Sequence, residues 1–231
     1  MGITRFIEQL EELPSGKGVF NPWREVDAEN DLGRDCPGIR RGQLAHFLKS
    51  RLGRARFLII GEASGYQGCH FTGIPMTSER ILLGNKRDIG ITPESILPGL
   101  PPRRTSRPEL NPGGFSEPTA TIVWGTVASS SIDPRAVCIW NTVPQHLYNP
   151  AKGLLSNRNP SQQEIVEGIK ILEGFLGLFP RAELIAVGNA AATGLTRMGR
   201  NFTKVRHPAR GGSTLFRAQA ARIFNPKRLA A

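Results

Sequence analysis

The chain of 231 residues contains only three cysteines, Cys36, Cys69 and Cys138, and no two of them lie close together. An odd number of cysteines at wide spacing argues against a disulfide framework and fits a reducing compartment, so we expect a cytoplasmic protein. Three thiolates cannot supply the four cysteine ligands of an iron–sulfur cluster, and the sequence has no CxxC half-site. We therefore expect no metal and no other cofactor.

Long apolar runs are missing as well. No stretch approaches the length of a membrane-spanning helix, and the first residues show no signal-peptide pattern, so we expect no membrane partner. The sequence has no Walker motif and no GxGxxG after a predicted strand, which leaves little support for a nucleotide-binding hydrolase or transferase. It also has neither the HxE nor the PCxxC signature of zinc deaminases, which excludes that class.

Acidic residues are scarce relative to basic ones. The chain has 30 Lys and Arg against 19 Asp and Glu, a formal net charge of +11. Such an excess is typical of proteins that bind a polyanion, usually nucleic acid, although a basic proteome or solubility alone is the blander explanation. Arg103, Arg104 and Arg107 lie in the proline-rich segment 91–118. We interpret this segment as a basic loop without regular structure, either ordered on a partner or a flexible connection.

Short apolar runs predict three buried strands, at 57–60, 136–140 and 184–187, and a fourth short strand is predicted at about 203–206. Apolar residues at helical spacing predict helices between them, most clearly over 165–176. Because strands and helices alternate, we expect an α/β fold, a three-layer α/β/α sandwich with a central, mainly parallel four-stranded sheet. No internal repeat or linker is present, so residues 1–231 are predicted to form a single domain. Residues 14–42, rich in turn formers and charges, are predicted to form a long surface loop.

The segment 61–76, which reads GEASGYQGCHFTGIPM, directly follows the first predicted strand. Its glycines let the backbone approach a flat or anionic ligand closely, at the strand end where α/β sheets place their ligands. Glu62 is the only carboxylate in this segment. A carboxylate suits the orientation of a water molecule or a base better than the binding of a phosphate, so the segment indicates a site that performs chemistry.

Two further predicted strands end in polar residues. Asn141 follows the second strand, and His207 follows the fourth. Because the carboxyl ends of parallel strands share one edge of a sheet, we expect Glu62, Asn141 and His207 to line one crevice. Each also has an ordinary structural interpretation: Glu62 as a helix cap or arginine partner, Asn141 as a turn residue, and His207 as a hydrogen-bonded turn histidine. Their joint placement favours a site.

These segments resemble the motifs of the uracil-DNA glycosylase superfamily. Residues 61–65, GEASG, resemble its first motif in the form GEAPG, with Ser64 in place of proline. Residues 71–76, FTGIPM, resemble its TGxPF continuation, and residues 207–209, HPA, resemble its second motif, HPS. Asn141 after an apolar strand matches the asparagine that reads the base. The motifs occur in the family's order, and the resemblance extends over positions 57–224.

The resemblance implies an enzyme that turns uracil out of DNA and hydrolyses its N-glycosidic bond, leaving an abasic site. An asparagine amide would pair with uracil N3–H and O4, and a histidine donor would stabilise the departing uracilate. By this resemblance Glu62 and His207 are the catalytic residues. The residues implied to form the base pocket are Gly61, Ala63, Gly65, Phe71, Met76 and Asn141. Those implied to bind DNA are Arg103, Arg104, Arg107, Arg210, Gly211 and Ser213.

The chain departs from the family pattern in the first motif. Ala63 stands where the best-known branch has an aspartate water base, and Gly65 stands where it has the tyrosine that blocks thymine. We therefore expect Glu62 to position the attacking water, unless catalysis rests on leaving-group stabilisation alone. Met76 replaces a base-stacking phenylalanine, so either Phe71 or Met76 is predicted to stack on the base.

The second motif departs from the pattern too. Arg210 and Gly211 replace the expected apolar wedge, so Arg210 is predicted either to fill the gap in the duplex or to hold a phosphate. No lysine lies in these motifs to form a Schiff base. We thus expect a monomeric, monofunctional glycosylase whose partner is DNA containing uracil. Two alternatives remain open: a nucleic-acid-binding protein with the same fold and little catalysis, and a glycosylase for hypoxanthine or xanthine.

Overall fold

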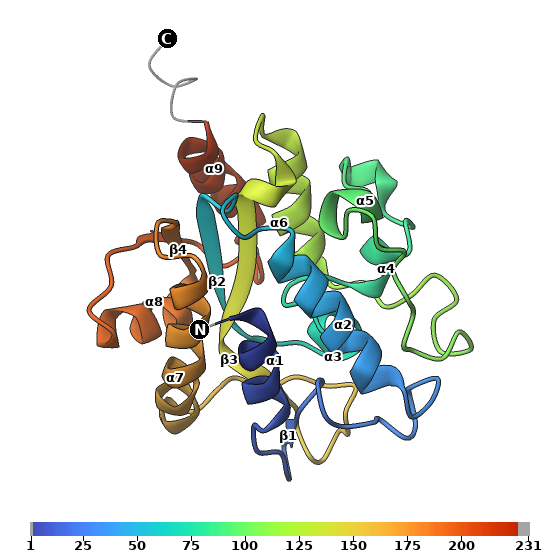
Figure 1. The fold of residues 1–231 in the computed structure, drawn as a ribbon. Coiled ribbons are helices and arrows are strands. Elements are labelled where there is room, and N and C mark those ends of the chain that lie inside the picture. Colours follow the sequence, from blue (N-terminus) through green and yellow to red (C-terminus); the bar gives the residue numbers. More distant parts are fainter. Residues whose placement is uncertain (1, 226–231) are drawn as a thin grey trace.

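The computed structural model describes residues 2–225, which are built around a five-stranded sheet with helices on both faces (Figure 1). The strands lie in the order β1-β3-β2-β4-β5. β2, β3, β4 and β5 are parallel, and β1 is antiparallel to β3. The predicted α/β sandwich with a mainly parallel sheet is confirmed. The strand bounds are β1 Val19–Phe20, β2 Phe57–Ser64, β3 Val137–Leu147, β4 Glu183–Val187 and β5 Thr203–Val205.

The fifth strand, β1, is an addition to the four that the sequence predicts. It is two residues long and pairs Val19 with Leu147 and Phe20 with His146 at the edge of the sheet. A strand of two residues is too short to show the alternation by which strands are recognised. The four predicted strands are all present.

The helices α7 and α8 cover one face of the sheet, and α2 and α6 cover the other (Figure 1). α7 begins with a capping box, in which the Ser161 side chain accepts from the Glu164 N–H and the Glu164 carboxylate accepts from the Ser161 N–H. The longer helices are α1 Ile3–Glu11, α2 Cys36–Lys49, α6 Pro118–Ser129, α7 Gln162–Leu178, α8 Gly188–Arg197 and α9 Ser213–Phe224. Shorter ones are α3 Cys69–Thr72, α4 Glu79–Leu82 and α5 Pro93–Ile96, with 3-10 turns at Arg87–Ile89 and Pro134–Ala136. No helix within residues 2–225 is long and apolar enough to cross a membrane.

The segment 14–42 is not the surface loop that its turn formers predict. Trp23 is completely buried, and α2 already begins at Cys36. Asn21 is buried as well, and its side-chain amide donates to the carbonyl oxygens of Leu10 at 2.8 Å and Leu13 at 3.0 Å. A buried amide that satisfies carbonyls at the end of a helix fixes the chain direction there, which composition alone does not reveal.

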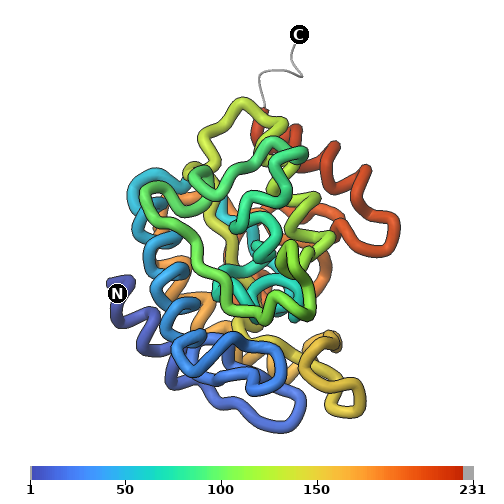
Figure 2. Tube along the Cα trace, turned by 90° about the vertical axis from the view of Figure 1, so that its right-hand side faces the viewer, coloured from blue at the N-terminus to red at the C-terminus, as the bar shows by residue number. Residues whose placement is uncertain are grey.

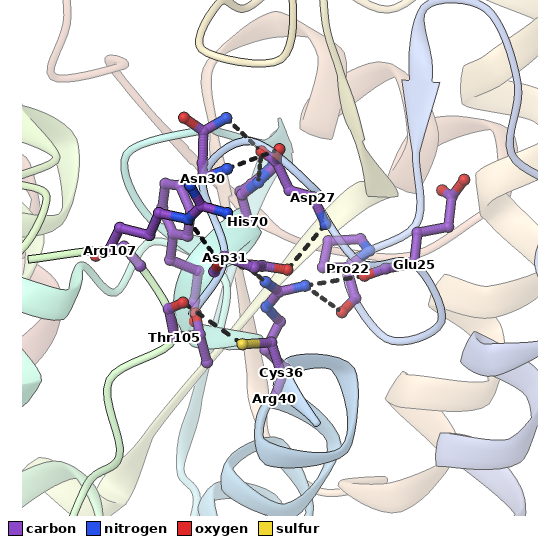
Figure 3. A network of polar contacts seen from close by, with 12 residues as sticks. Pro22, Glu25, Asp27, Asn30, Asp31, Cys36, Arg40, His70, Thr105 and Arg107 are labelled. Carbon is purple, nitrogen blue, oxygen red and sulfur yellow. Dashed lines mark hydrogen bonds and ion pairs between the residues drawn. The ribbon is translucent and has the colours of Figure 1, made fainter. Parts of the chain in front are cut away.

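A buried polar network ties this segment to α2 and to the proline-rich segment 91–118 (Figure 3). The Arg40 guanidinium pairs with the Asp31 carboxylate, and both side chains are fully buried. The Leu32 N–H donates to the Thr105 carbonyl at 2.7 Å, and the Arg107 guanidinium donates to the Asp31 carbonyl at 3.1 Å. The two segments therefore lie side by side, on the face of the molecule turned to the viewer in Figure 2.

The proline-rich segment contains one element of regular structure, the helix α5, so the expectation of none is wrong in that part. Pro93 occupies the first position of α5, where its missing N–H costs no helical hydrogen bond. The Thr92 side chain before it accepts from the Ser95 N–H and caps the helix. Proline at the start of a helix thus marks a boundary and does not exclude the helix.

The strands β2 and β3 run further than their apolar residues predict. β2 continues to Ser64 and β3 to Leu147, so Glu62 and Asn141 lie inside strands and not in turns behind them. The two strands pair regularly as far as Ala63, with Gly61 opposite Asn141, and the register shifts between Ala63 and Ser64. Hydrogen-bonded strand backbone sets the direction of each side chain, which gives the residues at this edge a rigid support.

Candidate active site

A cavity of about 870 Å³ lies at the carboxyl edge of the sheet. Its wall is formed by the end of β2, Asn141 of β3, the end of β5 and the turn after it, the first residues of α6 and α8, two residues of α9 and the loop before α7. Here β2 lies between β3 and β4, so the strand order reverses, and open α/β sheets bind ligands beside such a reversal. The structure brings these predicted residues together in the wall: Glu62, Ala63, Gly65, Met76, Asn141, His207 and Arg210.

Gly61 is a glycine because two side chains occupy the space that a larger residue would need. A β-carbon added at Gly61 would lie 2.5 Å from Asn141 Oδ1 and 2.9 Å from Met76 Cε. Met76 is itself unusual, since it is a non-glycine residue with φ of 45°. Backbone in this left-handed region is strained, and such strain is kept where the side chain must be placed in one direction. Gly61, Met76 and Asn141 are thus tightly packed together, and Met76 and Asn141 line the cavity.

The Asn141 amide is held in one orientation by Ser64. The Ser64 hydroxyl donates to the Pro144 carbonyl, so its oxygen can only accept from Asn141. Asn141 Nδ2 donates to that oxygen at 3.4 Å, which leaves Oδ1 on the other branch of the amide. Oδ1 is buried and has no hydrogen-bond partner among residues 2–225. An unpartnered buried acceptor is costly, and a ligand N–H in the cavity would satisfy it.

Glu62 is half-buried in the cavity wall. Burial raises the pKa of its carboxyl, and the positive charge of Arg210 opposes that rise. Arg210 has φ of 52°, another left-handed conformation at a residue other than glycine. A carboxylate that faces a cavity next to a cation can orient a water molecule as a general base.

His207 presents one N–H to the cavity. The Ala209 N–H donates to its Nδ1 at 3.1 Å, so in the neutral ring the proton sits on Nε2. Burial lowers the pKa of His207, and the charges of Arg206 and Arg210 lower it further. Gly188 lies against the ring with φ of +83°, and a β-carbon there would be 3.2 Å from His207 Cβ. The neutral imidazole is therefore a positioned donor.

Of the predicted pocket residues Phe71 and Ala63, only Ala63 lines the cavity. Phe71 is completely buried and does not belong to the cavity wall; its ring stacks on Phe115, with 4.5 Å between centroids. Ala63 lines the cavity and also packs against a small apolar cluster that contains Val143. Of the two residues predicted to stack on the base, the structure brings only Met76 to the wall.

The arginines of the proline-rich segment lie away from this cavity. Arg103 is exposed and pairs with Asp35 at 3.0 Å. Arg104 donates to carbonyl oxygens of its own loop, those of Ser106, Arg107, Asn111 and Pro112. Arg107 donates to the carbonyls of Asp31 and Ala28. Their role in DNA binding stays a prediction, as do the roles of Gly211 and of Ser213, the first residue of α9.

Several polar residues of the wall lie outside the motifs recognised in the sequence, among them Glu117 and Asn157. Asn157 lies in the loop before α7, and its Oδ1 accepts from the Tyr66 N–H at 3.0 Å, which ties this loop to the turn after β2. Glu117 is the N-cap residue of α6, because Pro118 occupies the first helical position. That proline was a usable signal, since proline at the first position places the cap one residue before it.

The wall can therefore supply a donor, an acceptor and two carboxyl groups to one flat ligand, from His207, Asn141, Glu62 and Glu117. Basic side chains at the rim, those of Lys204, Arg206 and Arg210, favour a ligand with negative charge. Within the described residues no cluster of three or more His, Cys, Asp or Glu side chains is placed to hold a metal ion.

No protein-family model matches the chain, and no curated protein matches its sequence. Among solved structures the chain is similar to wild-type SMUG2 from Pedobacter heparinus, with a TM-score of 0.61 and 14% sequence identity. The likeness covers 98% of this chain and 98% of that one. The chain thus has the fold of Pedobacter heparinus SMUG2 over nearly its whole length.

Proposed function

We propose that this protein is a DNA glycosylase that removes uracil from DNA by hydrolysis of the N-glycosidic bond. The observation that carries the proposal is the placement of Glu62, Asn141 and His207 around one cavity, with Glu62 in β2, Asn141 in β3 and His207 after β5. The fold shared with SMUG2, a glycosylase of the uracil-DNA glycosylase superfamily, supports it.

The hydrogen-bonding groups of the cavity match the edge of uracil. Asn141 Oδ1 is a free acceptor for the N3–H, a donor that cytosine lacks. His207 Nε2–H is a donor for O2, where negative charge gathers as the glycosidic bond breaks. Glu62 would orient the water that attacks the sugar, which becomes oxocarbenium-like in the transition state.

The net charge of +11 and the basic rim of the cavity support DNA as the substrate. Binding would begin with phosphate contacts, and the damaged base would then leave the stack and enter the cavity. The polar edge that Asn141 and His207 recognise also occurs in hypoxanthine and xanthine, which carry an imide or lactam N–H next to a carbonyl. We therefore include both in the test.

The test is the release of free base from oligonucleotides that contain uracil, hypoxanthine or xanthine, in single- and double-stranded form. We expect release from uracil-containing DNA, followed by strand cleavage only after alkaline treatment of the abasic site. DNA binding without release of any base would instead identify a nucleic-acid-binding protein with this fold. Preferential release of a purine would keep the reaction and change the substrate.

A further inference from the structure

Glu117 has an unusual position for the residue that caps a helix. A carboxylate at the N-cap normally accepts from the first N–H groups of its helix, but the Glu117 side chain makes no such bond. It turns into the cavity wall and packs against Gly68, where an added β-carbon would lie 1.9 Å from Glu117 Oε2. The glycine therefore makes room for this carboxyl group.

The Glu117 carboxyl also lacks a partner. Its Oε2 atom is buried and has no hydrogen-bond partner among residues 2–225. Burial raises the pKa of Glu117 to about 7, and no charged neighbour opposes that rise. Glu62, in the same wall, has its pKa rise opposed by Arg210. When the surroundings of two carboxyl groups in one site differ in this way, one group can be a protonated acid while the other is an ionised base. Here Glu117 is the candidate acid and Glu62 the candidate base.

We propose that Glu117, in its neutral acid form, is a hydrogen-bond donor that contacts a carbonyl oxygen of the bound base. The proposal rests on the glycosylase function proposed above and adds a further recognition residue to it. Deamination replaces an amino group of a base by a carbonyl oxygen, so a donor at this edge favours a deaminated base over its parent. An ionised carboxylate at the same place would repel that oxygen.

Protonation of Glu117 is tested first by folding stability, which needs no activity. The carboxyl has a pKa near 4.5 in the unfolded chain and about 7 in the folded protein, so the folded state binds the proton more tightly. The stability of the wild type should therefore fall, relative to Glu117→Gln, as the pH rises from about 4.5 to about 7. Glu109→Gln, a change at an exposed glutamate outside the cavity, is the matched control and should show no such difference.

Contact with the base is tested by single-turnover excision of uracil between pH 6 and pH 9. We expect the wild-type rate to fall roughly tenfold above pH 7, the effect of about one hydrogen bond. The Glu117→Gln variant should lose this fall because its amide donates at every pH, and Glu117→Ala should be slow throughout. Equal profiles for the wild type and Glu117→Gln, or a normal rate for Glu117→Ala, would overturn the proposal.

Gly68→Ala supplies a second variant, because the new methyl group would displace the Glu117 carboxyl from its place. It should slow excision about as much as Glu117→Ala, and the double variant should be no slower than either. If the double variant is slower than either single variant, the effect of Gly68→Ala does not act through the Glu117 carboxyl. If the wild type releases no base, the proposed function and this contact are both refuted. If the wild type is active but its stability difference from Glu117→Gln does not change with pH, only the protonated state of Glu117 is refuted.

Discussion

The α-carbon of Gly61 lies so close to the Asn141 amide that a β-carbon there would come within 2.5 Å of Asn141 Oδ1. The first prediction follows from this contact. Gly61→Ala should cost about 1–3 kcal/mol of folding free energy through overpacking and should slow base excision by roughly two orders of magnitude, because Asn141, the proposed base reader, is displaced. Thermal unfolding and single-turnover excision measure the two effects. Gly177→Ala, on an open helix surface with nothing within 4 Å, is the control and should leave excision unchanged.

A second prediction concerns the orientation of Asn141. Asn141→Asp should lower uracil excision, because the carboxylate can no longer donate to Ser64, whose hydroxyl hydrogen already goes to the Pro144 carbonyl. The carboxylate can accept from an exocyclic amine, so the variant is expected to gain activity on cytosine. Excision assays on paired uracil and cytosine substrates check this outcome. Undiminished uracil excision by Asn141→Asp would place the residue outside the recognition of the base.

The third prediction is that the Nε2–H of His207 stabilises the departing base. His207→Ala should lose about 2–4 kcal/mol of transition-state stabilisation, or roughly two to three orders of magnitude in the single-turnover rate. DNA affinity should change little. His207→Gln keeps a donor near the position of Nε2 and should recover part of the rate, whereas a purely structural role would give no such recovery. A lower melting temperature with an unchanged rate in His207→Ala would argue for the structural role.

A fourth prediction uses the raised pKa of Glu62. If the ionised carboxylate orients the attacking water, the rate should fall as the pH drops through this pKa, which lies above the ordinary glutamate value. Glu62→Gln should remove the acid limb of the pH profile and part of the rate, and Glu62→Ala should lose more, up to roughly two to four orders of magnitude. The measurement is single-turnover excision from pH 4.5 to pH 7. A near-normal rate for Glu62→Ala would show that Glu62 does not orient the water, so that catalysis would rest on His207 and the electrostatic potential in the cavity.

The fifth prediction is that DNA affinity falls steeply with salt, with a slope of several units on logarithmic axes, because phosphate contacts release counterions. Arg210→Ala should lower this slope without loss of stability, since the Arg210 side chain is exposed at the cavity rim. Arg104→Ala should mainly destabilise the proline-rich segment, whose carbonyl groups the Arg104 guanidinium binds. Fluorescence anisotropy at several salt concentrations, together with thermal unfolding, separates the two effects. An affinity that is independent of salt would contradict the interpretation of the charge.

The sequence by itself determined the architecture of the sheet and the edge at which the cavity lies. Buried parallel strands are continuous apolar runs, so 57–60, 136–140 and 184–187 could be recognised without long-range information. The carboxyl ends of parallel strands share one edge of the sheet, so residues at or after these ends were expected to lie close together. For this reason Glu62, Asn141 and His207, the last of which follows the fourth predicted strand, could be predicted to line one cavity. The two-residue β1 could not be recognised, because its only support is pairing with β3.

Only the tertiary structure decided which side chains face the cavity and in what chemical state. Phe71 and Met76 are equivalent candidates in the sequence, yet one packs in the interior and the other lines the cavity. From the sequence, Glu117 is an ordinary helix-capping residue. In the structure its Oε2 atom is buried against Gly68 and has no hydrogen-bond partner among the described residues. Hydrogen bonds and pKa values depend on atoms from distant parts of the chain, whereas strand and helix patterns depend on near neighbours. The local signals therefore predict the scaffold, and the long-range contacts decide the chemistry.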